Sequence, residues 1–266
     1  MNTNKIILFV MLAVYAPSAW SQVRLDTLGL YKLNLPDSFL RTPCLREAKT
    51  GVIFFKADFD LDADGSPCAY NESNTGLLDN VLGKNPDGKW FAVVTSDTAK
   101  MKPVRQDSGG VCPGYYISIT RLELARFDEK DYRRYVHPDS ICYFVLPGGK
   151  SGYEKMGIKV GDVGIVFNSR TQLHEYAIFA DTGPVNVLGE GSMKLAKALQ
   201  VPCRIDAKGR IKGGMDQAGI VYIILPKSGQ KSYSALSDEL IRQLVTRSLL
   251  SLNMSLDDLI KIAKGL

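Results

Sequence analysis

The stretch Tyr176-Ala-Ile-Phe-Ala-Asp181-Thr-Gly-Pro-Val-Asn-Val-Leu-Gly-Glu190-Gly-Ser192 combines the local signals that decide the fold. Tyr176 to Ala180 is apolar and aromatic and predicts a strand. Thr182 to Gly189 is punctuated by glycine and proline and predicts a turn with a short strand inside it. Ser192 to Leu199 predicts a helix with Ser192 as its N-cap.

Asp181 and Glu190 are two carboxylates nine positions apart on either side of this turn. Such a pair can hold an acid and a base across one scissile bond. Glu190 precedes the expected helix, whose dipole favours the ionised carboxylate unless burial acts the other way. The same residues also fit a plain turn and capping arrangement without any chemistry.

Short β-rich runs separated by Gly, Pro, Asn and Asp clusters recur along the rest of the chain. We expect a mainly β fold, a β-barrel that resembles the double-psi barrels of some endoglucanases and of a lytic transglycosylase, with a few short helices, hence α+β overall. The expected strands cover 52–55, 90–94, 115–120, 142–146, 163–167, 176–180 and 220–225.

The two ends of the chain differ in composition and apolar spacing from this β-rich middle. Residues 1–21 have the basic start, apolar run and small-residue cleavage site of a secretory signal peptide, which predicts a secreted or periplasmic protein without membrane insertion. Residues 22–230 are expected to form the β domain. Residues 231–266 are expected to form a C-terminal helical appendage that packs against the barrel, with docking of a protein partner as the alternative.

Charge and cysteine usage exclude several classes of function. The formal net charge is only +5, and the basic residues are scattered among acids, so we expect no nucleic acid partner. The five cysteines form no CxxC pair, which disfavours zinc, and their disulfide pairing stays open. His137 and His174 are too few for a metal cluster, so no metal and no cofactor are expected. The chain has neither a Gly-x-Ser-x-Gly elbow nor a phosphate-binding loop.

An acidic run lies in Phe55-Lys-Ala-Asp58-Phe-Asp60-Leu-Asp62-Ala-Asp64-Gly65. If this run is extended, its four aspartates share one face, where bound cations would relieve their mutual repulsion. Two alternatives remain, a solvated acidic turn and a calcium loop. The calcium loop is disfavoured because Asn71 stands at the twelfth position, where a glutamate is expected.

Several motifs, in the same order along the chain, resemble those of the glycoside hydrolase family 75 chitosanases and their bacterial relatives, over about residues 50–229. They are the acidic run, the Asp181/Glu190 segment, Pro113-Gly-Tyr-Tyr116-Ile-Ser-Ile-Thr120, Tyr143-Phe-Val-Leu-Pro147-Gly148 and Gly219-Ile-Val-Tyr-Ile-Ile-Leu-Pro226. One departure is Ala63, where fungal members usually have a cysteine, so no disulfide is expected at that position.

The resemblance implies an endo-acting glycoside hydrolase that cleaves β-1,4 bonds of chitosan with inversion, using Asp181 and Glu190 as the catalytic pair. We expect Glu190 to be the general acid and Asp181 the general base, provided that the pocket of Glu190 raises its pKa; otherwise the two roles are exchanged. The expected substrate-binding residues of this amino-sugar polysaccharide site are Asp58, Asp60, Asp62, Asp64, Gln106 and Tyr116. The alternatives are a peptidoglycan-cleaving hydrolase and a non-catalytic periplasmic binding or interaction protein.

Overall fold

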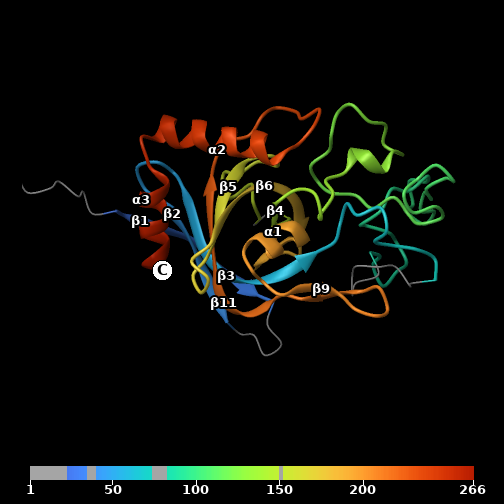
Figure 1. Cartoon of the computed structure of the whole chain (residues 1–266), viewed down its shortest axis with the longest axis horizontal. Helices are drawn as coiled ribbons and strands as arrows, with labels where there is room; N and C mark the ends of the chain where they lie inside the picture. The colour runs from blue at the N-terminus through green and yellow to red at the C-terminus, as the bar shows by residue number, and fades with distance from the viewer. Residues whose placement is uncertain (1–22, 35–39, 74–82, 150–151) are drawn as a thin grey trace, which may run out of the picture.

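The structure, a computed structural model, describes residues 23–34, 40–73, 83–149 and 152–266. Figure 1 shows strands in the centre, the two C-terminal helices on one side and a long loop region, coloured teal to green, on the other. The expected signal peptide, 1–21, lies outside the described residues.

The described chain contains eleven strands, three α-helices and one short 3₁₀ helix. The strands are β1 (Leu25–Leu33), β2 (Arg41–Glu47), β3 (Ile53–Asp62), β4 (Tyr143–Pro147), β5 (Val163–Asn168), β6 (His174–Gly183), β7 (Val187–Leu188), β8 (Glu190–Ser192), β9 (Cys203–Ile205), β10 (Ile211–Gly213) and β11 (Met215–Leu225). The α-helices are α1 (Met193–Ala198), α2 (Asp238–Leu252) and α3 (Leu256–Lys264), and the 3₁₀ helix is η1 (Tyr132–Arg134).

Six of the strands close into a barrel in the order β11, β5, β6, β4, β8 and β3, because β3 also pairs with β11. Two of these pairings, β4 with β6 and β3 with β8, are parallel, and the others are antiparallel. β2, β1 and β7 extend the sheet beyond β3. The fold is therefore mainly β, with a barrel and short helices, as expected from the sequence.

Alternate side chains of the barrel strands belong to two separate apolar clusters. Phe55, Phe144, Phe179 and Tyr222 meet in the first cluster, inside the barrel. The second cluster is on the outer face, where Val145 and other strand residues meet the C-terminal helices. This alternation lets a strand that is apolar on its inner side carry polar groups on its outer side.

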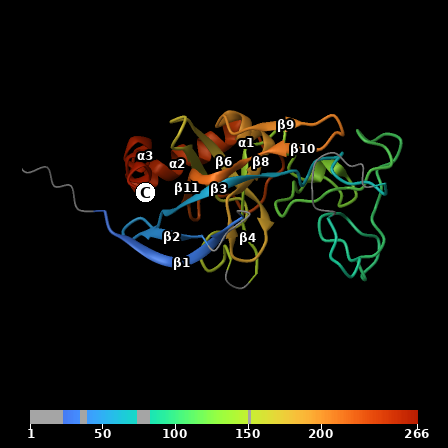
Figure 2. The same cartoon turned by 90° about the horizontal axis from the view of Figure 1, so that it is seen from below.

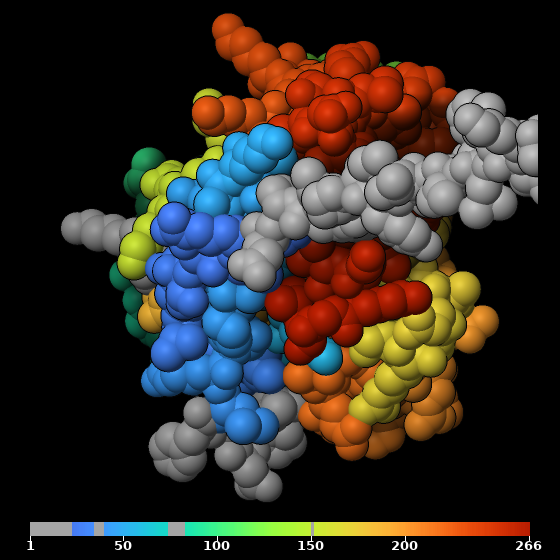
Figure 3. Space-filling view, turned by 90° about the vertical axis from the view of Figure 1, so that its left-hand side faces the viewer, coloured from blue at the N-terminus to red at the C-terminus, as the bar shows by residue number. Residues whose placement is uncertain are grey.

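The two C-terminal helices predicted from the sequence are present, and they pack on the barrel. Ile241, Leu244 and Val245 of α2 and Leu259 of α3 are buried in the outer cluster. Figure 3 shows these helices, in red, beside the N-terminal strands, in blue. Within the described part of the chain, no helix has the length and apolar character needed to cross a bilayer.

The strands expected at 90–94 and 115–120 are wrong as strands. These segments lie in the loop region, and with the other described residues they make only isolated bridges, Val93 with Ser118 and Arg105 with Tyr116 among them. Their buried side chains form small clusters of their own, such as Trp90 on Tyr116. A disulfide, Cys68–Cys112, joins the start of this region to its middle and resolves the pairing that the sequence left open.

Removing this disulfide should loosen the loop region. The bond closes a loop with a sequence separation of 44 residues, for which the chain-entropy model gives about 4 kcal/mol of unfolding free energy. We expect the double variant Cys68→Ser/Cys112→Ser to lower the urea midpoint clearly, while Cys203→Ser, which removes a free and half-buried thiol, changes it little. Equal midpoints for the two variants would show that the bridge contributes nothing.

Candidate active site

Three carboxylates lie in one row across neighbouring barrel strands: Asp181 on β6, Glu190 on β8 and Asp60 on β3, with β4 between β6 and β8. Val145 of β4 pairs with Asp181 of β6 on one side and with Glu190 of β8 on the other. Glu190 in turn pairs with Asp60 of β3. Because directly paired residues point to the same side of a sheet, and Val145 belongs to the outer cluster, these three carboxylates project from the outer face.

The spacing of this row suits chemistry on a glycosidic bond. Asp181 and Glu190 are separated by one intervening strand, which sets their Cα atoms about 10 Å apart at the usual spacing between strands. Inverting glycosidases keep their two carboxyl groups about 6.5 to 9.5 Å apart, so that a water molecule fits beside the sugar. The backbone spacing between Asp181 and Glu190 therefore permits a separation of their carboxyl groups in that range.

A bulge in the pairing puts Asp181 on the outer face. The register between β4 and β6 shifts between Phe144 and Val145, so Ala180 has no direct partner, and both Ala180 and Asp181 face outward. The Oδ1 atom of Asp181 accepts hydrogen bonds from the backbone amides of Arg121 (3.0 Å) and Thr182 (2.7 Å). Only 9% of Asp181 is exposed. This burial raises the pKa of Asp181 to about 7, although the two amides act in the opposite direction.

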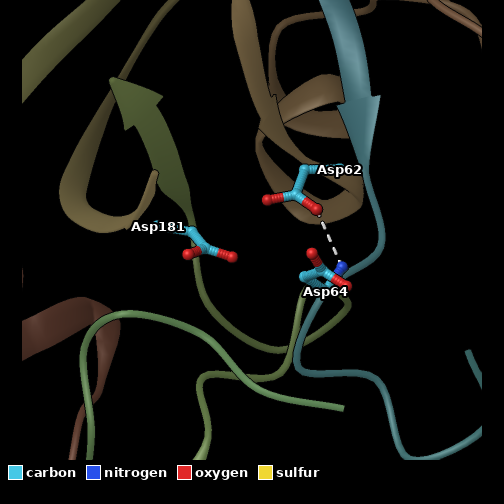
Figure 4. Close-up of side chains that lie close together, drawn as sticks. All are labelled: Asp62, Asp64 and Asp181. Carbon is cyan, nitrogen blue, oxygen red and sulfur yellow. Dashed lines mark hydrogen bonds between the residues drawn. The ribbon is translucent and has the colours of Figure 1, made fainter. Parts of the chain in front are cut away.

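Asp62 and Asp64 reach the same place as Asp181 from the end of β3. One carboxylate oxygen of each of the three lies within 4.8 Å of the others, and Figure 4 shows the three side chains directed toward one another. Asp62 accepts a hydrogen bond from the backbone amide of Asp64 (2.8 Å). Asp64 accepts from the hydroxyls of Tyr70 (2.8 Å) and Ser118 (3.2 Å). Three carboxylates this close repel one another when ionised, so the cluster favours a proton or a cation among them.

The buried side chain of Tyr143 lies beneath these acids. Its hydroxyl donates to the backbone carbonyl of Asp64 (3.0 Å), and burial raises its pKa far above the ordinary value. The negative charges of Asp62, Asp181, Asp64 and Glu190 raise it further. Tyr143 therefore stays protonated, and it fixes the turn that carries Asp64.

A cavity of about 320 Å³ adjoins Glu190 on the same face. Its polar lining comes from Asn34, Asp60, Glu190 and Lys212, and its apolar lining includes Val145 and Leu188. The side-chain amide of Asn34 donates to Asp60 (2.8 Å). Burial raises the pKa of Asp60, and the charge of Asp216 adds to this. The cavity thus offers carboxylates, one amide and apolar walls, which is a suitable lining for a sugar ring.

Gly183, two residues beyond Asp181 on β6, leaves the room into which Glu190 extends. A Cβ atom on Gly183 would lie 2.7 Å from Oε2 of Glu190 and 3.2 Å from Cγ1 of Val145. The glutamate therefore leans across Val145 toward the strand that carries Asp181. Its carboxylate lies beside Gly183 at the end of β6, and Glu190 as a whole is half-buried.

The sequence-derived site residues fall into three groups. Asp60, Asp62, Asp64, Asp181 and Glu190 gather on the outer face, as described above. Asp58 is on the same strand, but only 1% of it is exposed, so a sugar has no surface of Asp58 to touch. The burial of Asp58 and Asp62 also shows that the run is not a solvated acidic turn.

Gln106 and Tyr116, predicted as sugar contacts, are both buried in the loop region. Gln106 donates to the carbonyl of Pro67 (2.5 Å) and accepts from the amide of Cys112 (3.3 Å), so it braces the segment around the disulfide. Tyr116 packs edge to face on Trp90. These contacts account for both residues structurally, and a role in binding sugar stays a prediction.

Four residues of the site were not singled out from the sequence: Asn34, Tyr143, Gly183 and Lys212. Tyr143 and Gly183 lie within motifs already noted, but nothing local in the sequence marks either residue as part of the site. Asn34 and Lys212 come from segments without a motif, and only the fold brings them to the cavity.

Comparison with known proteins adds no identification to this geometry. A scan against protein-family models and a search of curated proteins both find no match for the chain.

Proposed function

We propose that the protein is an endo-acting glycoside hydrolase that cleaves β-1,4 bonds between glucosamine units of chitosan by single displacement. The observation that carries the proposal is the row of Asp181, Val145 and Glu190, with two carboxylates on one face and a single strand between them. The cavity beside Glu190 supplies a place for the sugar. The resemblance of the motifs to family 75 chitosanases supports the same reaction.

The raised pKa of Asp181 favours Asp181 as the general acid and Glu190 as the general base. A general acid must still hold its proton near neutral pH, and burial raises the pKa of Asp181 to about 7. In the proposed cycle, Asp181 protonates the glycosidic oxygen as the bond to the anomeric carbon breaks. Glu190 takes a proton from the water that attacks this carbon from the opposite face. This is the exchanged assignment named in the sequence analysis.

The charges around the row support a cationic substrate. Asp60 and Glu190 line the cavity, and Asp62, Asp64 and Asp181 cluster at the end of β3, although the whole chain has a formal net charge of +5. The local potential, and not the net charge, governs which polymer enters a cleft. Lys212 lines the same cavity and would suit a substituent that carries a carboxylate, so peptidoglycan is the second candidate substrate.

Export is part of the proposal, because both polymers lie outside the cytoplasm. The signal-like start of the sequence and the Cys68–Cys112 disulfide are compatible with a secreted or periplasmic protein. The apolar faces of α2 and α3 are covered by the barrel, so docking of a protein partner there has less support than packing.

The test is incubation of the mature protein with chitosan and, separately, with purified peptidoglycan, followed by measurement of new reducing ends. We expect release from chitosan by the wild type and at least a 100-fold loss in Glu190→Gln, the usual scale for a catalytic base. Release from peptidoglycan alone would favour the second candidate. No release from either polymer would favour a non-catalytic binding protein.

Gly183→Ala should disturb the site without disturbing the fold. The added Cβ would lie 2.7 Å from Oε2 of Glu190 and push the carboxylate aside. A displacement of about 1 Å can cost roughly 100-fold in rate, so we expect that loss in chitosan hydrolysis with little change in the unfolding midpoint. The matched control is Gly148→Ala on the neighbouring strand end, where the nearest atom to a new Cβ is 3.5 Å away. Equal activities of the two variants would count against the position assigned to Glu190.

A further inference from the structure

Asp58 is a buried carboxyl group that the proposed reaction does not use. Only 1% of it is exposed, and among the described residues neither of its carboxylate oxygens has a hydrogen-bond partner. The hydroxyl of Tyr222, which is fully buried, also lacks a hydrogen-bond partner in the part of the chain that the structure describes. Buried polar groups are nearly always hydrogen-bonded, so two unpaired groups this close to a candidate active site need a reason beyond packing.

The carboxyl group of Asp58 lies directly against the backbone that carries Glu190. A Cβ atom on Gly189 would lie 2.2 Å from Oδ1 of Asp58, and Gly189 has a φ of +109°, which favours glycine. The carbonyl of Gly189 also accepts a hydrogen bond from the amide of Asp60 (2.6 Å). β3 therefore holds the Gly189–Glu190 corner at two points, through the backbone amide of Asp60 and through the Asp58 carboxyl group.

The charges that act on Asp58 are negative. Burial raises its pKa to about 7, and the carboxylates of Asp60 on β3 and Asp216 on β11 raise it further. The backbone amides of Asp58 and Asn34 lower the pKa of Asp58, but neither amide is in hydrogen-bonding geometry with the Asp58 carboxyl group. The phenol of Tyr222 on β11 experiences the charges of Asp58, Asp60 and Glu190, and its own pKa is far above the ordinary value. An ionised Asp58 would thus meet like charge from β3 and β11.

We propose that Asp58 is a positioning residue for Glu190, which seats the Gly189–Glu190 corner in its neutral form and releases that corner when it ionises. The neutral carboxyl group packs against Gly189 without repulsion. The ionised group is repelled by Asp60 and Asp216, and we expect the Gly189–Glu190 corner, which lies directly against it, to move away. The link to catalysis rests on the proposed role of Glu190, but the movement of the corner does not.

Enzyme kinetics alone cannot separate this effect from the titration of Asp181, whose pKa is also about 7. The test therefore uses Asp181→Asn as its background and measures amide hydrogen exchange in peptides covering residues 184–192, corrected for intrinsic rates, from pH 5 to 9. We expect protection of this segment to fall about tenfold between pH 6 and pH 8. Asp58→Asn, a neutral group of the same shape, should hold the protection constant over that range.

Asp62→Asn in the same background is the matched control, because Asp62 is also buried on β3 but faces Asp64 and Asp181. It should leave the pH dependence of the corner unchanged. The proposal is overturned if the hydrogen-exchange protection of this corner does not change with pH. It is also overturned if that protection changes equally with and without the Asp58 carboxyl group.

A carboxyl-carbon NMR titration of the Asp181→Asn protein tests the proposal even if Asp58→Asn does not fold. The carboxyl carbon of Asp58 should titrate near neutral pH, and the amide chemical shifts of Gly189 and Glu190 should change over the same pH range. A pKa below about 5 for Asp58, near its ordinary range, would overturn the proposal. Failure of chitosan hydrolysis, in contrast, would overturn the proposed function and leave both of these measurements meaningful.

Discussion

Asp181→Asn is expected to lower chitosan hydrolysis by about 1,000-fold or more at pH 6, the scale of a lost general acid. Asparagine keeps the hydrogen bonds from the amides of Arg121 and Thr182 to its side-chain oxygen, but it has no acidic proton to donate. The measurement is the initial rate of reducing-end release, with urea unfolding of the same samples.

The fold should survive this change, because asparagine has the shape of the neutral carboxyl group that burial already favours. Asp257→Asn, an exposed acid of α3, is the matched control and should keep full activity. If Asp181→Asn keeps more than about a tenth of the wild-type rate, Asp181 is not the proton donor, because removal of an acid catalyst causes a much larger loss.

The second large effect concerns stability against pH. Asp58 and Asp181 have their pKa raised from 3.8 to about 7 in the folded protein. Between these values the folded chain binds more protons than the unfolded chain, so stability falls as pH rises from about 4 to about 7 and levels off above that. Each group contributes up to about 4 kcal/mol to this fall, at 1.36 kcal/mol for each pH unit.

Urea unfolding of the wild type and of Asp58→Asn/Asp181→Asn at pH 4.5, 5.5, 6.5 and 7.5 measures this contribution. The double variant removes both titrations, so the difference in unfolding free energy between the two proteins should grow in favour of the variant as pH rises. Half-buried acids whose pKa is lowered, such as Asp131 and Asp258, act in the opposite direction, but equally in both proteins. A difference that stays constant across the series would mean that neither buried acid has a raised pKa.

The sequence predicted the barrel well where apolar runs are continuous. β3, β4, β5, β6 and β11 all match expected strands, because strands buried on both faces have a strong compositional signal. β1 and β2 were missed: they extend the sheet beyond the barrel, and their side chains alternate between buried and exposed positions with polar residues among them. The segments 90–94 and 115–120 have strand-like composition, but no neighbouring strand pairs with them along their length.

The site could be predicted only in part, because its geometry depends on pairings between distant segments. Asp181 and Glu190 were expected from the local pattern and from the motif resemblance. Their placement on either side of Val145 depends on a parallel pairing, an antiparallel pairing and a bulge, none of which has a local signal. The alternation of β3 indicated an outward Asp58, but it could not reveal that Gly189 would cover that side chain.

The stereochemistry of hydrolysis tests the central claim most directly. Proton NMR of the first products released from chitosan identifies the anomer before mutarotation equalises the two forms. Two carboxylates separated by one strand leave room for a water molecule beside the sugar, so the account predicts that the α-anomer is released first. Initial release of the β-anomer would mean retention through a covalent intermediate and would contradict the roles given to Asp181 and Glu190.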